Sequence, residues 1–371
     1  MEYVEESQNP DADYAQAVGQ LPEGHLELTL TSPRAYLQPR RYPEAYQMAE
    51  DHRRMLWTKE EVRSLHEDVA DWKAMSPEER APLQFLLNYF TQADVDVASS
   101  YFERLAKHYS QPELRMLLGR IIDREMTHVD CYDMLPDQFG IPRIEYSEML
   151  KIDVVADQRA FMFSKQFEGQ GVVERLADLV VHICGEGIGI YGIFLMLLSP
   201  SRFGKMKSLG QEVVSWSARD ENDHCYSLTW FFNKEIEENP EFVGSEKYHE
   251  LRQAIIDMFK GAVERGVAYA KAVLNKGPIQ GVVLDEIEVF LKQLANRRIQ
   301  KLHMGFEKIF PEVGDILELD WASDLFASSL DNFFETAGTN YQVGAMTGKW
   351  EYPEKGTFKK DSDILKEMML T

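Results

Sequence analysis

The sequence predicts an all-α fold in which long helices pack as a bundle. Apolar residues recur with helical periodicity through several stretches of about 25 to 30 residues, and the alternation typical of β-strands is scarce. Helices of this length exceed the usual average of about 11 to 12 residues, which favours a bundle whose members span the whole domain.

The expected domain organisation is an irregular arm over residues 1–40, a helical domain over 41–346 and a flexible tail over 347–371. Proline and glycine mark several helix ends: Pro112 opens one long segment that Gly140 closes, and Pro240 ends another. The expected helical stretches are residues 81–109, 111–140, 171–199, about 205–238, 246–274, 282–304 and 322–345.

Composition excludes several classes of protein. A net charge of −22 disfavours nucleic-acid binding, which depends on neutralising phosphates. We find no apolar run near the roughly 18 to 20 residues of a membrane helix, and the polar, acidic N-terminus is unlike a secretory signal. Three cysteines without CxxC spacing indicate free, buried thiols in a reducing cytoplasm.

Glu-x-x-His is the pattern that points to chemistry, because a Glu and a His three residues apart share one helix face. It occurs three times, where about one occurrence is expected by chance. Glu246 and His249 lie in a polar segment, so we interpret that pair as exposed and accidental. The other two pairs, Glu125/His128 and Glu221/His224, lie inside strongly apolar helices, where an unpaired charge is costly.

A carboxylate on the preceding helix accompanies each apolar pair. Asp94 precedes Glu125 by 31 residues, and Glu186 precedes Glu221 by 35. Taken alone, Asp94 is better interpreted as a capped or solvated residue, and Asp96 is a second candidate for the same ligand role. Glu186 alone could be a buried acid that is paired elsewhere. Together, four carboxylates and two histidines from four helices match a ferritin-like dinuclear site. Oxygen-rich donors of this kind suit iron or manganese better than zinc.

Tyr132 lies seven residues after Glu125, which returns it to within about 20° of the same helix face. A phenol one turn from an oxygen-activating centre is oxidisable. The alternative interpretation is a buried tyrosine whose hydroxyl is satisfied elsewhere.

Taken together, these motifs resemble the small, radical-generating subunit of class I ribonucleotide reductase, over about Met55 to Met346. The motifs that carry the resemblance are Asp94, EMTH (125–128) with Tyr132, GEGI (185–188) around Glu186, RDENDHC (219–225), LANRR (294–298) and DNFFETAGTNYQVGAM (331–346).

The resemblance implies a role for each matched residue. Asp94, Glu125 and His128 would bind one metal ion and Glu186, Glu221 and His224 the other, with shared bridging carboxylates. Tyr132 would hold a tyrosyl radical formed when the reduced metals react with oxygen. Trp57 matches the family's buried tryptophan, for which core packing is the alternative, and Asp220 the aspartate that links it to a metal-bound histidine.

The resemblance also implies partners. We expect a homodimer that starts nucleotide reduction in a large subunit, which the C-terminal tail would dock, with Trp350 or Tyr352 as the redox relay. Two departures stand out: Ile190 replaces the phenylalanine of many relatives, although Phe194 keeps an aromatic ring one turn later, and the chain ends in MMLT rather than in an acidic stretch.

Alternatives remain at this stage. The metal is expected to be Fe/Fe, with Mn/Mn and Mn/Fe also compatible with the ligand set. Another di-iron oxidase, desaturase or hydroxylase would share the ligands but needs a substrate cavity and no Tyr132. An iron store of the ferritin type has chains about half this length, and a purely structural bundle would not bury so many charges.

Overall fold

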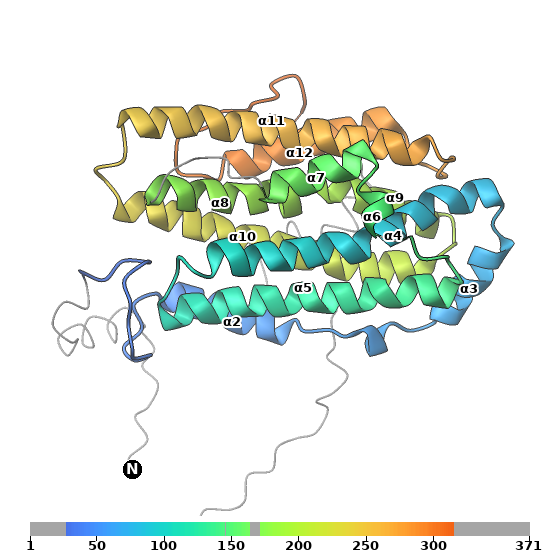
Figure 1. Cartoon of the computed structure of the whole chain (residues 1–371), viewed down its shortest axis with the longest axis horizontal. Helices are drawn as coiled ribbons and strands as arrows, with labels where there is room; N and C mark the ends of the chain where they lie inside the picture. The colour runs from blue at the N-terminus through green and yellow to red at the C-terminus, as the bar shows by residue number, and fades with distance from the viewer. Residues whose placement is uncertain (1–26, 145, 164–170, 315–371) are drawn as a thin grey trace, which may run out of the picture. The chain divides into compact units, whose positions relative to one another are not determined.

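A computed structural model describes residues 27–144, 146–163 and 171–314 (Figure 1). Every regular element in these ranges is helical, and all of them belong to one compact unit. The helices are α2 (Pro43–Arg54), α3 (Leu65–Ala74), α4 (Pro77–Ser100), α5 (Pro112–Phe139), α6 (Tyr146–Met149), α7 (Asp153–Phe163), α8 (Val172–Cys184), α9 (Tyr191–Arg202), α10 (Ser215–Glu238), α11 (Glu246–Leu274) and α12 (Leu284–Ile299). A short 3₁₀ turn, η2 (Lys59–Glu61), follows α2.

Within the described ranges, three π-helical turns interrupt or extend the long helices. They are η3 (Tyr101–Leu105) after α4, η4 (Gly185–Gly189) between α8 and α9, and η5 (Leu209–Val214) before α10. A π turn inserts one extra residue and so re-aims the side chains around it, and such turns occur frequently at functional sites.

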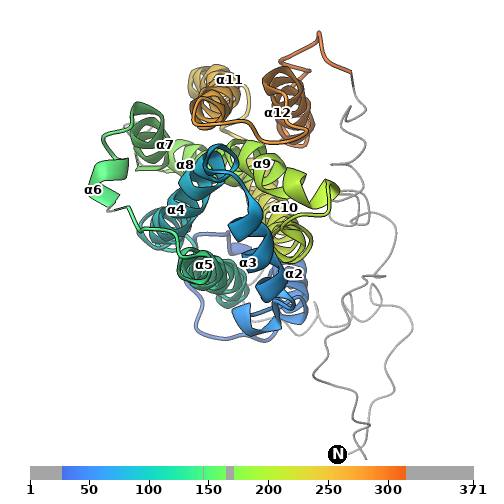
Figure 2. The same ribbon diagram turned by 90° about the vertical axis from the view of Figure 1, so that its right-hand side faces the viewer.

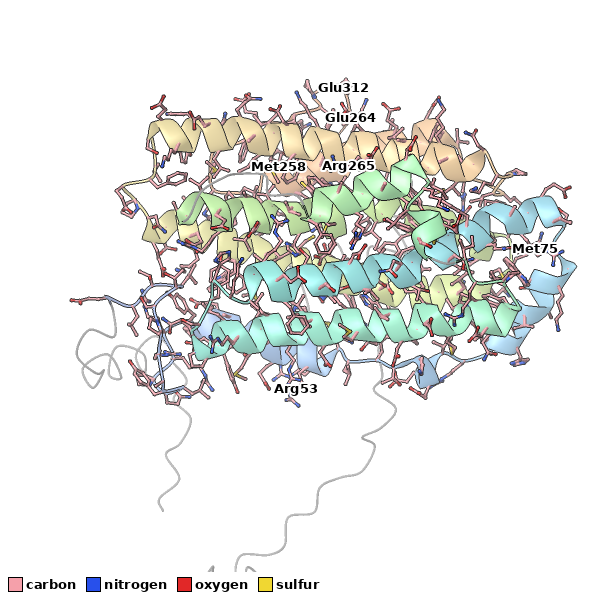
Figure 3. The ribbon with its side chains drawn as sticks, in the orientation of Figure 1. Arg53, Met75, Met258, Glu264, Arg265 and Glu312 are labelled. Atoms are coloured by element: carbon pink, nitrogen blue, oxygen red, sulfur yellow. The ribbon has the colours of Figure 1, made fainter. Side chains whose placement is uncertain are left out.

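Helices α4, α5, α8 and α10 form the central bundle, seen nearly end-on in Figure 2. α2 covers α5 on one side, and α11 and α12 pack beside α8 and η4 on the other. Apolar side chains fill the space between these helices, while charged ones such as Arg53 on α2 and Glu264 on α11 are exposed (Figure 3).

Capping residues determine where α4 and α5 begin and end. α4 begins at Pro77, four residues before the predicted start, because Ser76 and Glu79 form a reciprocal capping box. α5 begins at Pro112 and ends before Gly140, whose φ of 66° is the left-handed conformation that glycine adopts without strain. The stretches predicted at 246–274 and near 205–238 match the structure closely, whereas the shorter α2, α3, α6 and α7 were not predicted. The predicted helix 322–345 lies outside the described residues.

One expectation about apolar runs is wrong. Among the described residues, Val172–Arg202 is long enough, and one window within it apolar enough, to cross a membrane by length and composition alone. Its apolar window is 94% buried, however, because α8, η4 and α9 run through the interior of the bundle. Burial against other helices accounts for this composition.

The cysteines behave as predicted. Cys131, Cys184 and Cys225 are free and buried. Burial raises the pKa of Cys131 and of Cys225 to about 12, so both thiols stay neutral.

Candidate metal centre

Six acidic and imidazole side chains meet inside the central bundle, each at most 1% exposed. They are Asp94 from α4, Glu125 and His128 from α5, Glu186 from η4, and Glu221 and His224 from α10. These are the six residues that the sequence predicted as ligands. The third Glu-x-x-His pair, Glu246 and His249, is exposed at the start of α11, as predicted.

Glu125 and Glu221 lie between the two histidines. Glu125 places Oε1 2.9 Å from Nδ1 of His224 and Oε2 3.7 Å from Nδ1 of His128. Glu221 places Oε1 3.3 Å from Nδ1 of His128 and Oε2 3.3 Å from Nδ1 of His224. Each of these carboxylates therefore offers one oxygen to each histidine, which is the arrangement of a bridging ligand.

Glu186 belongs to the His224 side of the cluster. Its Oε2 lies 3.1 Å from Nδ1 of His224. One ligand atom from each of Glu125, Glu186, Glu221 and His224 falls within 4.8 Å of the others, a grouping compact enough for one ion.

Asp94 lies among the same charged groups. Charges on His128 and on Glu125, Glu186 and Glu221 act on its carboxyl group, which is buried with Oδ2 lacking any hydrogen-bond partner among the described residues. Its rival Asp96 is only half-buried and pairs with Arg159, with 3.3 Å between Oδ2 and Nε. Of the two carboxylates, Asp94 is therefore the better placed as a candidate ligand.

The donor set fits two metal ions. Buried polar atoms are normally hydrogen-bonded, yet several carboxylate oxygens here have no hydrogen-bond partner among the described residues. They are Asp94 Oδ2, both oxygens of Glu125, Glu186 Oε1 and Glu221 Oε2. Such acceptors are costly to bury unless cations satisfy them. Carboxylates with one imidazole on each side are ligands suited to iron or manganese.

Crowding of these charges alters their protonation. Burial, reinforced by neighbouring carboxylates, raises the pKa of Glu186 to about 8. Burial would also raise that of Glu125, but the neighbouring imidazoles of His128 and His224 outweigh it and hold the pKa at about 2. Burial would lower the pKa of both histidines, and the surrounding carboxylates instead raise it well above 6.5. Without metal, protons on the two imidazoles therefore supply part of the missing positive charge.

Trp57 and Asp220 form a buried link to the centre. The indole Nε1 of Trp57 donates to Oδ2 of Asp220 at 2.6 Å, and the same oxygen lies 3.2 Å from Nε2 of His128. Arg124 and Arg219 flank Asp220 at 3.4 Å and 2.9 Å, and despite its burial they help to lower its pKa strongly. An ionised Asp220 on Nε2 leaves Nδ1 of His128 directed at the carboxylates.

Tyr132 lies beside the centre, but its hydroxyl group does not bond to a predicted ligand. It donates to Oγ of Ser217 at 3.2 Å. The phenol ring stacks on Phe90 at 4.3 Å between centroids, and Phe90 stacks in turn on Phe194. Phe194 thus joins the aromatic cluster, and Ile190 is buried at the junction of η4 and α9. Trp350 and Tyr352 lie outside the described residues.

Three polar residues at the centre were missed by sequence reasoning. Ser217 accepts from Tyr132, His52 stacks on His224 at 5.5 Å, and Tyr101 donates from its hydroxyl to Glu186 Oε2 at 2.9 Å. Only Tyr101 had a readable signal, because it follows Asp94 by seven residues, the spacing that singled out Tyr132 after Glu125.

The chain is similar to known proteins of one family. The family model described as "Ribonucleotide reductase, small chain" matches residues 34–315. A probable ribonucleoside-diphosphate reductase small subunit of Invertebrate iridescent virus 3 is 29% identical, over 88% of this chain and 89% of that protein. A ribonucleoside-diphosphate reductase subunit beta of Chlamydia pneumoniae is 28% identical, over 77% of this chain and 84% of that protein.

Solved structures show the same fold at lower identity. A putative class I ribonucleotide reductase from Bacillus halodurans has a TM-score of 0.66 at 20% identity, over 76% of this chain and 99% of that one. A dimanganese(II) protein from Streptococcus sanguinis has a TM-score of 0.63 at 15% identity, over 76% and 96%. A homodimer of a ribonucleotide reductase protein from Saccharomyces cerevisiae has a TM-score of 0.63 at 19% identity, over 84% and 97%.

Proposed function

Since the chain belongs to the family of ribonucleotide reductase small chains, we propose that it is the radical-generating subunit of a ribonucleoside-diphosphate reductase. The single observation that carries this proposal is the buried cluster of four carboxylates and two histidines with Tyr132 beside it. In this function the subunit starts, through long-range electron transfer, the reduction of ribonucleotides to deoxyribonucleotides in a large partner subunit.

The six predicted ligands would hold two ions. Asp94 and His128 would contribute to one site and Glu186 and His224 to the other, and Glu125 and Glu221, whose oxygens divide between the two histidines, would be shared by both. Ions of iron or manganese, when bound, supply the one-electron redox chemistry and the reactivity with oxygen. Fe/Fe is our first proposal, and a dimanganese(II) relative of this fold supports Mn/Mn as the next.

Tyr132 is the proposed radical site. Bound ions would supply the one-electron oxidant, and the hydroxyl proton of Tyr132 would pass to Ser217 Oγ, the acceptor of its hydrogen bond at 3.2 Å. The dry aromatic wall of Phe90 and Phe194 keeps water away from the resulting phenoxyl group. Trp57 and Asp220 offer a hydrogen-bonded connection from His128 along which an electron can leave or enter.

The proposed partners are a second copy of this chain and the large subunit. A homodimer of the same fold from yeast supports the first. For the second, we propose that residues 347–371 dock the large subunit and that Trp350 or Tyr352 relays the electron. Removing residues 351–371 is expected to abolish turnover with the large subunit while leaving the radical intact. Undiminished turnover contradicts the tail's role.

A second candidate, an oxidase acting on a small substrate, would require a cavity at the centre. A hollow of about 580 Å³, including its open mouth, lies between α4, α7 and η4. Its lining includes Ala93 and Gly185, the chain neighbours of Asp94 and Glu186, but none of the six ligand residues. The hollow therefore stops short of the ligand side chains, which favours the radical-generating subunit.

The test of the proposed function combines metal analysis with EPR. Protein reconstituted with iron or manganese and then exposed to oxygen is expected to hold two ions and to show a tyrosyl signal. Tyr132→Phe should keep both ions and lose the signal completely. A signal that survives this substitution refutes the assignment to Tyr132, and protein that binds neither metal refutes the centre itself.

A further inference from the structure

Tyr101 makes a direct contact with a predicted ligand. Its hydroxyl donates to Oε2 of Glu186 at 2.9 Å, and both side chains are fully buried or nearly so. The other oxygen, Oε1, has no hydrogen-bond partner among the described residues. The phenol thus holds Oε2, the same oxygen that lies 3.1 Å from Nδ1 of His224, and so fixes how the carboxylate faces that imidazole.

The two partners are brought together by two π turns. Tyr101 is the first residue of η3, and Glu186 is the second residue of η4. Because Tyr101 follows Asp94 by seven residues, it lies on the face of its helix that also carries this carboxylate. Both α4 with its extension and α5 therefore place a tyrosine two turns beyond a predicted ligand.

Neighbouring contacts hold the Tyr101 ring in place. The imidazole of His182, one turn before Glu186 on α8, packs on it with 4.4 Å between ring centroids. Arg104, from the same π turn as Tyr101, donates from Nε to Oδ1 of Asp178 on α8 at 2.9 Å. The turn is thereby tied to α8 at two points, so the phenol is oriented before any ion binds.

We propose that Tyr101 is a positioning residue that holds Glu186 beside His224, so that this carboxylate serves the His224 side of the centre alone. The inference rests on the proposed metal centre. It follows from the contrast with Glu125 and Glu221, each of which offers both oxygens to the two histidines. A phenol donor on Oε2 fixes the rotation of the Glu186 carboxylate toward His224, and so makes the two halves of the centre unequal.

Binding of Mn²⁺ without oxygen tests this inference independently of activity. Metal-free Tyr101→Phe is expected to lose about 10- to 100-fold in affinity for one of the two ions, the usual effect of removing a partner of a ligand. The low-temperature EPR spectrum of the two-manganese form should change as well. Tyr269→Phe is the matched control, since its hydroxyl is also fully buried but has no hydrogen-bond partner among the described residues.

A double-mutant comparison shows whether Tyr101 acts through Glu186. Adding Tyr101→Phe to Glu186→Ala should cause no further loss of affinity, because the acceptor is already gone. An additional loss as large as in the parent protein overturns the inference, as does a single Tyr101→Phe variant with the parent's affinities and spectrum. A parent protein that binds no Mn²⁺ overturns the proposed centre and this inference together, whereas a normal parent with an inert Tyr101→Phe overturns the inference alone.

Discussion

The hydroxyl of Tyr132 donates a hydrogen bond to Oγ of Ser217 at 3.2 Å, linking α5 to α10 beside the predicted metal ligands. Both residues are buried. Ser217 thus accepts the hydrogen bond of the Tyr132 hydroxyl. Substituting Ser217 changes the surroundings of the proposed radical without removing any predicted ligand.

Ser217→Ala should change the radical without removing the metal. The phenol loses its acceptor in a dry site, so the free energy of unfolding should fall by about 1 to 3 kcal/mol. The high-field EPR spectrum of the tyrosyl signal should shift, because its g values report hydrogen bonding to the phenoxyl oxygen. Denaturant unfolding and EPR measure the two effects.

Ser227→Ala is the matched control for this prediction. Ser227 is also a buried serine on α10, but its Oγ contacts Nε2 of His52 at 3.3 Å. This variant should leave the tyrosyl spectrum unchanged. An identical spectrum in Ser217→Ala would show that the serine has no part in the radical's environment.

Asp220→Asn should weaken both the fold and metal binding. The ionised carboxylate of Asp220 lies 3.4 Å from the buried guanidinium of Arg124, and removing this buried counter-charge should cost about 3 to 5 kcal/mol. Affinity for the ion beside His128 should fall about 10- to 100-fold, because the ring loses the partner that orients it. Urea unfolding and Mn²⁺ titration measure these losses.

Trp57→Phe shows whether metal affinity depends on the carboxylate that orients His128 or on the indole of Trp57. It removes the indole donor but keeps Asp220 on His128, so Mn²⁺ affinity should stay within a few-fold of the parent value. If Asp220→Asn binds Mn²⁺ as the parent does, the carboxylate does not orient the histidine.

Much of the fold, and the grouping of the six predicted ligand residues, could be predicted from the sequence for identifiable reasons. Periodic apolar residues and Pro112 and Gly140 define α5, and a carboxylate such as Glu186 inside an almost uncharged helix signals that something compensates it. The shorter α2, α3, α6 and α7 were missed because 4 to 12 residues carry too little periodicity to stand out.

Side-chain contacts between different helices could not be predicted from the sequence. Spacing along one helix shows which residues share a face, but Tyr132 and Ser217 are 85 positions apart, and so are Tyr101 and Glu186. Which atom meets which depends on the register between helices. The π turns shift that register by a residue, and we know of no local sequence pattern that marks them.

Glu221→Ala and Glu246→Ala form a matched pair, because each glutamate begins a Glu-x-x-His motif. Glu221 faces both histidines of the centre, so its loss should lower metal affinity by more than about 100-fold, beyond the effect of removing an outer partner. Glu246 is exposed, and its replacement should leave two ions bound. Metal analysis after gel filtration compares the variants, and the reverse result would overturn the ligand assignment.

Stabilisation by metal should grow as pH rises. In the metal-free protein the carboxylates raise the pKa of His128 and His224 well above 6.5, although burial opposes this. The folded chain therefore holds protons that the unfolded chain releases near pH 6.5. The stability that these protons contribute is complete below that pH and is lost as pH rises through the folded-state pKa. Bound ions replace the protons, so metal binding releases them and weakens as pH falls.

The difference in melting temperature between Mn²⁺-loaded and chelated protein, measured without oxygen from pH 6 to 9, should increase steadily. A constant difference would mean that the two imidazoles are already neutral in the metal-free protein.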